Sequence, residues 1–188
     1  MREQMILQVA GQAFAETGYE RASMDHIAQL AEVSKPMLYA YFGSKEGLYV
    51  AYIERTGAEL VQRLVGVGPV GRLRAVIAEF LGFVQEHRDG WTVLFREMNT
   101  RRPLAEQVAE LRSQIVDEVR RMLEGEGTDA WTGLRPPASE GVAEAIVGAG
   151  ESLANWWLEK PDVARDDVTD WYVGLTRAAI AAATQREA

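Results

Sequence analysis

Apolar side chains recur every three or four positions along almost the whole chain, and no segment alternates convincingly between apolar and polar residues. The first pattern is typical of an amphipathic α-helix, and the missing alternation argues against β-strands. We therefore expect an all-α protein with about nine helices. The expected helices are one ending near Gly18, one each after Ser23 and Ser34, and six more near residues 44–65, 71–87, 91–99, 103–124, 140–159 and 166–185.

The first three expected helices are short and are separated by residues that begin or end helices. Gly18 can adopt the left-handed conformation that closes a helix. Ser23 and Ser34 can cap the next two helices through their hydroxyl groups. Pro36 suits the first turn of a helix, because its missing N–H has no helical partner there. Gly43 then ends the third helix, so two short helices stand back to back with a very tight turn between them.

This arrangement meets the requirements of a helix-turn-helix, in which one helix enters the major groove of DNA and the other supports it. Leu38 and Phe42 lie four residues apart and can anchor the reading helix in the core. Lys45 begins the next helix, whose free N–H groups also favour a phosphate. The residues that we expect at DNA are Ser23, Ser34, Lys35, Pro36, Met37, Tyr39, Tyr41 and Lys45.

These residue types suit different parts of the duplex. Lys35 can meet a phosphate or the edge of a guanine, and Met37 can pack on a thymine methyl. The hydroxyls of Tyr39 and Tyr41 can donate to phosphate oxygens, and Ser23 with the N–H groups after it offers a second phosphate site. Taken alone, a helical pair with tyrosines and one lysine is more often a plain packed corner, so the whole motif has to carry the interpretation.

The charge of the chain bears on this interpretation. The formal net charge is −8, and residues 1–50 hold four basic and six acidic groups, although DNA-binding domains are usually basic. Phosphate contacts are local, however, and the only formal charges from Ser34 to Lys45 are those of Lys35 and Lys45. We therefore expect a candidate DNA face that is locally positive.

The stretch from Ile6 to Ile53 resembles the DNA-binding domain of the tetracycline-repressor-type (TetR) transcriptional regulators. The matching segments are AFAETGYE, MDHIAQLAEVS and KPMLYAYFGSKEGL. The resemblance implies an N-terminal helix-turn-helix domain, residues 1–46, and a C-terminal ligand-binding and dimerisation domain, residues 47–188. By position it implies DNA contacts at Ser23, Lys35, Met37, Tyr39, Tyr41 and Lys45.

Three positions depart from the family pattern. Glu32 stands in the turn where glycine is common, so this residue must accept the turn geometry. Tyr41 stands where histidine is frequent, and its hydroxyl could replace that phosphate contact. The basic arm of many members is reduced here to Arg2, which leaves little reach into the minor groove.

The last two expected helices are apolar on more than one side. A helix that packs on one side only needs one apolar stripe. We therefore expect a homodimer that joins these helices in a four-helix bundle across a two-fold axis, the alternative being burial within one protomer. The expected interface residues are Ala145, Gly148, Ser152, Asn155, Trp156, Val173, Thr176 and Ile180. Such a dimer would read a palindrome with half-sites about 34–36 Å apart.

Aromatic and flexible apolar residues gather in the middle of the chain and are candidates for a ligand cavity. They are Phe80, Phe83, Trp91, Phe95, Met98, Asn99, Leu111 and Ile115, of which Asn99 would supply polar recognition. Aromatic residues at helical spacing are more often ordinary core, and that alternative stays open. A ligand among these helices would shift the helix 44–65 and so change the spacing of the two reading helices.

Composition narrows the remaining classes. The chain has no cysteine and only two histidines, so we expect no thiol chemistry, metal or cofactor. No apolar run is long enough for a membrane helix, and we expect a cytoplasmic protein. We interpret the chain as a DNA-binding repressor, not an enzyme, that leaves a palindromic operator when a small, largely apolar ligand binds. The alternatives are an activator, a regulator without a ligand, and a helical enzyme or scaffold with an apolar cavity.

Overall fold

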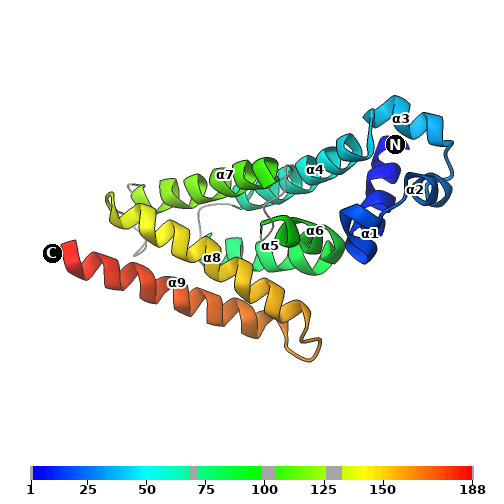
Figure 1. The fold of residues 1–188 in the computed structure, drawn as a ribbon. Helices are drawn as coiled ribbons and strands as arrows, with labels where there is room; N and C mark the ends of the chain where they lie inside the picture. Colours follow the sequence, from blue (N-terminus) through cyan, green and yellow to red (C-terminus); the bar gives the residue numbers. More distant parts are fainter. Residues whose placement is uncertain (1, 68–71, 99–104, 126–132, 188) are drawn as a thin grey trace. The chain divides into compact units, whose positions relative to one another are not determined.

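The computed structural model describes residues 2–67, 72–98, 105–125 and 133–187, and these residues form nine α-helices without a strand among them (Figure 1). The helices are α1 (Arg2–Arg21), α2 (Met24–Leu30), α3 (Lys35–Phe42), α4 (Lys45–Val65), α5 (Arg72–Glu86), α6 (Arg88–Met98), α7 (Ala105–Glu124), α8 (Ala138–Leu158) and α9 (Arg165–Glu187). The all-α prediction is confirmed, and the expected helix positions agree with the observed ones to within a few residues.

The helices pack as two compact units. The first is built from Met1–Leu60 with Glu86–Ala109, and the second from Val61–Gln85 with Glu110–Ala188. The helices α1 to α3 therefore share a unit with α6 and most of α4. Packing does not divide the chain at residue 46, so the functional boundary expected there stays a prediction.

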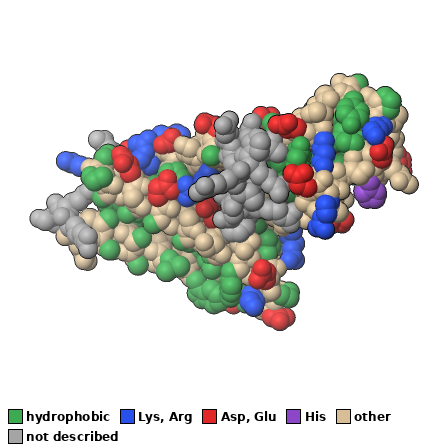
Figure 2. Space-filling model, in the orientation of Figure 1, with side chains coloured by type: hydrophobic (Ala, Val, Ile, Leu, Met, Phe, Trp, Pro, Cys, Tyr) green, Lys and Arg blue, Asp and Glu red, His purple; other side chains and the backbone are tan. Residues whose placement is uncertain are grey.

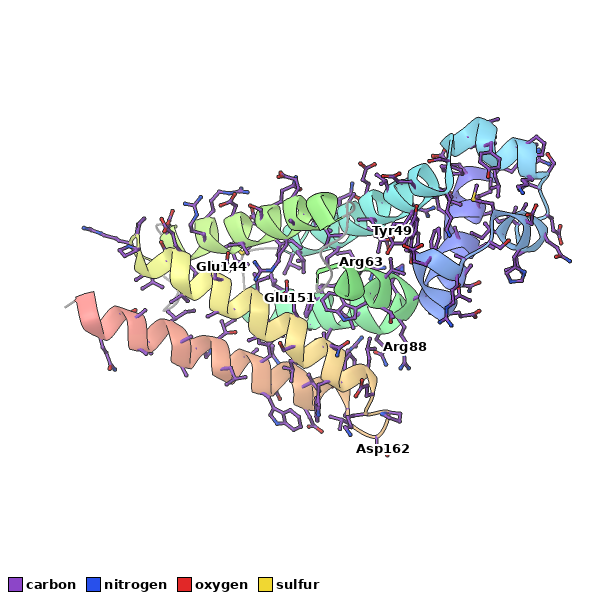
Figure 3. All side chains as sticks on the ribbon, in the orientation of Figure 1. Tyr49, Arg63, Arg88, Glu144, Glu151 and Asp162 are labelled. Carbon is purple, nitrogen blue, oxygen red and sulfur yellow. The ribbon has the colours of Figure 1, made fainter. Side chains whose placement is uncertain are left out.

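The core of the first unit holds the helix-turn-helix in place. Leu38 of α3 is completely buried, together with apolar side chains of α1, α2 and α4. The ring of Tyr49 on α4 packs edge-on against Phe14, with 4.7 Å between the ring centroids, and lies 4.9 Å from Tyr19 (Figure 3). These aromatic contacts stabilise the junction of α1 with α4.

The turns adopt the geometry that their residues predict. Gly18 has φ 76° and Gly43 has φ 72°, both in the region that favours glycine. Glu32, in the turn between α2 and α3, has φ 52°. A non-glycine residue seldom adopts this left-handed conformation, and Glu32 does so where the family commonly has glycine. The expectation that Glu32 accepts the turn geometry is confirmed.

In the second unit, α8 and α9 lie side by side (Figure 1). Their buried contact includes the phenol of Tyr172 on α9, whose hydroxyl donates a hydrogen bond of 2.7 Å to the carbonyl of Ile146 on α8. On its other side, α8 is joined to α7 through Arg112, which lies 2.8 Å from Glu144 and 2.9 Å from Glu151 (Figure 3). Burial raises the pKa of the Glu151 carboxyl, and Arg112 opposes that shift.

Gly150 permits the close approach of α8 to α9, and its replacement should destabilise the protein. A Cβ atom at this position would lie 2.9 Å from Cζ of the buried Tyr172 ring. We expect Gly150→Ala to lower the free energy of unfolding by about 1–3 kcal/mol, measured by urea denaturation. The control is Gly82→Ala on α5, away from this helix contact, where a Cβ atom would make only an ordinary contact of 3.4 Å with Nη1 of the flexible Arg165 side chain. Equal stability of the two variants would contradict this account of the helix contact.

Candidate nucleic-acid interface

The reading helix α3 presents the side chains that the sequence predicts. The Ser34 hydroxyl caps the helix by accepting a hydrogen bond from the N–H of Met37 at 3.3 Å. Leu38 turns into the core, whereas Tyr39 and Tyr41 are 43% and 50% exposed. Lys35 and Pro36 are exposed as well, and Met37 is partly buried. A helix anchored on one side and polar at its N-terminal end can enter a major groove.

The supporting helix α2 is capped by Ser23, whose hydroxyl accepts a hydrogen bond from the N–H of His26 at 3.5 Å. Ser23 and Asp25 are exposed, whereas Met24 and Ile27 are buried. The first turn of α2 therefore faces solvent through its polar residues. This agrees with the expected phosphate site at Ser23, which stays a prediction.

Lys45 is the first residue of α4, and its ammonium group is engaged within the chain. The Nζ atom donates a hydrogen bond of 3.0 Å to the carbonyl of Glu20, near the C-terminal end of α1. It also lies 4.7 Å from the centroid of the Tyr19 ring, within cation–π range. Contact with a phosphate would thus use an ammonium that α1 already positions.

Lys35 is also paired, with a partner that the sequence did not predict. Its Nζ atom lies 2.8 Å from Oδ2 of Asp25 on α2. The hydrogen bond with Asp25 raises the pKa of Lys35 above its ordinary value. The pair joins the N-terminal turns of α2 and α3 on the face that we expect at DNA. Both residues are visible in the sequence, but they are ten positions apart and only the fold brings them together.

A second surface, which we call the α8–α9 apolar face, has the character of a dimer interface. On α8 it includes Gly141, Ala145, Ser152 and Trp156, and on α9 it includes Trp171, Gly174, Leu175, Ala178 and Ala182. Trp156 and Trp171 are 39% and 50% exposed, with ring centroids 6.3 Å apart, and Leu175 is 58% exposed. Figure 2 shows hydrophobic side chains on this part of the molecule. Large apolar side chains exposed together mark a site of association.

The predicted interface is corrected on α9. Val173, Thr176 and Ile180 are buried within the single chain, so they do not belong to an exposed surface. The predicted residues on α8 do reach the surface: Ala145, Ser152 and Trp156 are exposed, and Gly148 and Asn155 are partly buried. The alternative of burial within one protomer therefore holds for one side of α9.

The predicted ligand residues fall in both units. Phe80, Phe83, Leu111 and Ile115 belong to the second, where Phe83 is completely buried and lies 5.6 Å from the guanidinium carbon of Arg63. Trp91 is buried in the first unit. The side chains of Phe95 and Met98, and the whole of Asn99, lie outside the described residues. The ligand site itself stays a prediction.

The first unit contains a cavity of about 330 Å³ that is polar, unlike the pocket that the sequence predicts. Its lining residues are Leu7, Gln8, Gln12, Tyr52, Arg55, Thr56, Glu59, Glu86, His87, Arg88, Asp89 and Gly90. His87 Nε2 lies 3.0 Å from Glu59 Oε1, and Arg55 donates a hydrogen bond of 3.1 Å to the carbonyl of Gln4. These contacts connect α4 to α1 and to the residues just before α6.

Tyr52, which lines this cavity, should make the folded protein less stable as the pH rises above 10. Burial raises the pKa of Tyr52 to about 12, and a hydrogen bond with Thr56 opposes the shift. The phenol ionises more readily in the unfolded chain, near its ordinary value of 10, so its burial favours folding fully below pH 10 and progressively less up to pH 12. We expect Tyr52→Phe to make the fall in unfolding free energy over this range less steep, measured by urea denaturation at several pH values. Exposed Tyr39→Phe is the control, and identical slopes in both variants would refute the assignment.

None of the helices in the described parts of the chain is long and apolar enough to cross a membrane. Within the same residues, no three histidine, cysteine or acidic side chains cluster as ligands for a metal ion.

Comparison with known proteins identifies the family. The family model described as "Bacterial regulatory proteins, tetR family" matches residues 6–52, and the model described as "Tetracyclin repressor-like, C-terminal domain" matches residues 69–179. The crystal structure of a TetR-like transcriptional regulator from Rhodococcus sp. RHA1 is similar over 96% of both chains, with 34% identity and a TM-score of 0.79.

Two curated relatives carry functional names. The transcriptional activator FasR of Mycolicibacterium smegmatis is 29% identical over 163 residues, which cover 84% of this chain and 72% of FasR. The transcriptional repressor NicS of Pseudomonas putida is 31% identical over 97 residues, covering 49% of this chain and 46% of NicS. Together with the family models and the exposed helix-turn-helix, these matches show that the chain belongs to the TetR family and is a DNA-binding transcriptional regulator.

Proposed function

We propose that this regulator is a homodimeric repressor that binds a palindromic operator through α2 and α3 of each protomer. The observation that carries this proposal is the exposed N-terminal half of α3, capped by Ser34 and anchored by Leu38. The α8–α9 apolar face supports the dimer, because two reading helices related by a two-fold axis bind the two halves of a palindrome.

A small, largely apolar molecule is proposed to release the dimer from its operator by binding the C-terminal domain. The signal would pass through α4, which begins at Lys45. The hydrogen bond from Lys45 to the Glu20 carbonyl and its contact with Tyr19 join the start of α4 to α1. A displacement of α4 would therefore also move the helices that stand on DNA, and so alter the spacing of the half-sites.

A second candidate is an activator of the same fold, favoured because FasR, the relative that matches 84% of this chain, is named an activator.

We propose no catalytic role for the two histidines, since His26 is exposed on α2 and His87 pairs with Glu59. The described residues therefore offer no reason to prefer an enzyme over a regulator.

The proposal is tested by selecting random duplex DNA with the purified protein at about 0.1 M salt. Enrichment of a palindrome supports a dimer that reads both halves of the operator. If the folded dimer enriches no sequence, the proposal is contradicted. A reporter gene placed behind the enriched sequence then separates the two candidates. Expression that falls when the regulator is produced indicates a repressor, and expression that rises indicates an activator.

A further inference from the structure

The pairing of Asp25 with Lys35 calls for a functional explanation. Lys35 is the only lysine or arginine from Met24 to Phe42, the segment that forms the helix-turn-helix. Its ammonium is held at 2.8 Å by a carboxylate from the other helix, and both side chains are largely exposed. Exposed ion pairs add little to stability. A carboxylate beside the one lysine or arginine of the helix-turn-helix segment is therefore expected to affect DNA binding more than folding.

We propose that Asp25 and Lys35 act together as a donor–acceptor pair that reads a G·C base pair in each half-site, while Asp25 weakens binding to DNA of other sequence. This inference rests on the proposed function, because it assumes that α2 and α3 contact operator DNA. It assigns a specificity-determining role to Asp25, a residue for which the sequence suggested no DNA contact.

The chemistry of the pair matches the major-groove edge of G·C. The lysine ammonium can only donate hydrogen bonds and the aspartate carboxylate can only accept them. In the major groove, guanine offers the acceptors O6 and N7, and cytosine offers the N4 donor. Lys35 would donate to guanine while Asp25 accepts from cytosine. The two side chains come from the first turns of α2 and α3, so one docking position presents both.

On DNA of other sequence, the pair of Asp25 and Lys35 weakens binding. Non-specific binding depends almost entirely on attraction between cations and phosphates. Asp25 offsets the charge of Lys35, which is the one lysine or arginine of the helix-turn-helix segment from Met24 to Phe42. The helix-turn-helix therefore attracts phosphates weakly and binds DNA firmly only where the base edges fit. The acidic balance of residues 1–50 is consistent with a regulator of this kind.

The test compares four variants with the wild-type protein. Asp25→Asn removes the carboxylate charge but keeps an acceptor oxygen, Asp25→Ala removes the acceptor, and Lys35→Ala removes the donor. The matched control is Glu16→Gln, which removes one negative charge from an exposed position of α1, outside the α2–α3 face. Each protein is taken through random-duplex selection and through titration with a non-operator duplex at about 50–200 mM salt. Circular dichroism verifies that every variant is folded.

We expect Asp25→Asn to bind the non-operator duplex about tenfold more tightly at the lowest salt. The slope of log affinity against log salt should steepen by about 1.8 per dimer, because one lysine in each protomer is freed to contact a phosphate. Asp25→Ala and Lys35→Ala should lose the preference for G·C at the same or adjacent positions of the half-site. Glu16→Gln should keep the wild-type sequence preference and salt slope.

An enriched palindrome whose base preferences are the same for wild type and Asp25→Ala would overturn the inference and leave the proposed function intact. The inference would also be overturned if the wild-type protein preferred A·T at the position whose preference these variants change. An Asp25→Asn salt slope equal to that of the wild type would overturn it as well. Failure of the wild-type protein to enrich any sequence would instead contradict the proposed function.

Discussion

Replacing Leu175 by arginine should convert the dimer to a monomer and lower its affinity for the operator by about a hundredfold or more. The affinity falls because two linked reading helices bind a palindrome about this much more tightly than one reading helix alone. Leu175 is the most exposed large apolar side chain of the α8–α9 apolar face. In the dimer, an arginine there would place a charge in an apolar contact, where an unpaired charge is costly. Analytical ultracentrifugation measures the change of mass, and titration with the selected operator measures the loss of affinity.

The control introduces the same residue outside this face. Asp162→Arg alters the loop between α8 and α9, where Asp162 is exposed (Figure 3). This variant should remain dimeric and bind the operator as the wild-type protein does. The Leu175→Arg chain should keep the helical content and thermal stability of a folded monomer, since Leu175 contributes little to the core of the single chain. A dimer of normal operator affinity in Leu175→Arg would show that the protomers associate elsewhere.

The residues of this interface show what periodicity can and cannot predict. On α8 the small and aromatic residues of the predicted stripe do reach the surface, as at Ala145 and Trp156. On α9 apolar residues occur all round the helix, so no stripe distinguishes the side that packs on α8 from the side left open. The pattern predicts Thr176 at the interface, whereas Thr176 is buried inside the protomer and its hydroxyl has no hydrogen-bond partner there.

The helix-turn-helix was predictable because its signals are local. The caps at Ser23 and Ser34 and the left-handed turn at Glu32 depend on residues within a few positions of one another. The hydrogen bond from Lys45 to Glu20 joins residues 25 positions apart and depends on how α4 meets α1. The spacing of residues in the sequence does not predict this contact, and it does not predict the contact of Asp25 with Lys35 either.

The ligand site was less predictable, because a cavity and a core use the same residue types. Phe83 is completely buried beside Arg63, and the ring centroids of Phe80 and Tyr172 lie 6.4 Å apart; such contacts occur both in a plain core and in the wall of a cavity. The polar cavity around His87 and Glu59 had no counterpart in the sequence analysis, because its lining joins α1, α4 and the residues around the start of α6.

Replacing Lys45 by alanine should lower the affinity for operator and non-operator DNA alike, by about ten- to a hundredfold for the dimer, and make the salt slope shallower by about 1.8. A lysine that contacts a phosphate carries no sequence information, so the enriched palindrome should not change. The conservative variant Lys45→Arg, which keeps the charge, should retain most of the affinity. The measurement is operator titration over a range of salt concentrations, with thermal unfolding recorded for each variant.

The contacts of Lys45 within the chain make this result informative. If the ammonium stays on the Glu20 carbonyl and the Tyr19 ring when DNA binds, Lys45→Ala will lower the unfolding temperature but leave the salt slope unchanged. That result would remove Lys45 from the DNA face and leave it as a link between α1 and α4. A shallower slope shows that the same ammonium also neutralises a phosphate. Lys45→Ala should weaken binding to every duplex, whereas Asp25→Asn should strengthen binding to non-operator DNA, so the two variants separate phosphate attraction from base reading on one small face.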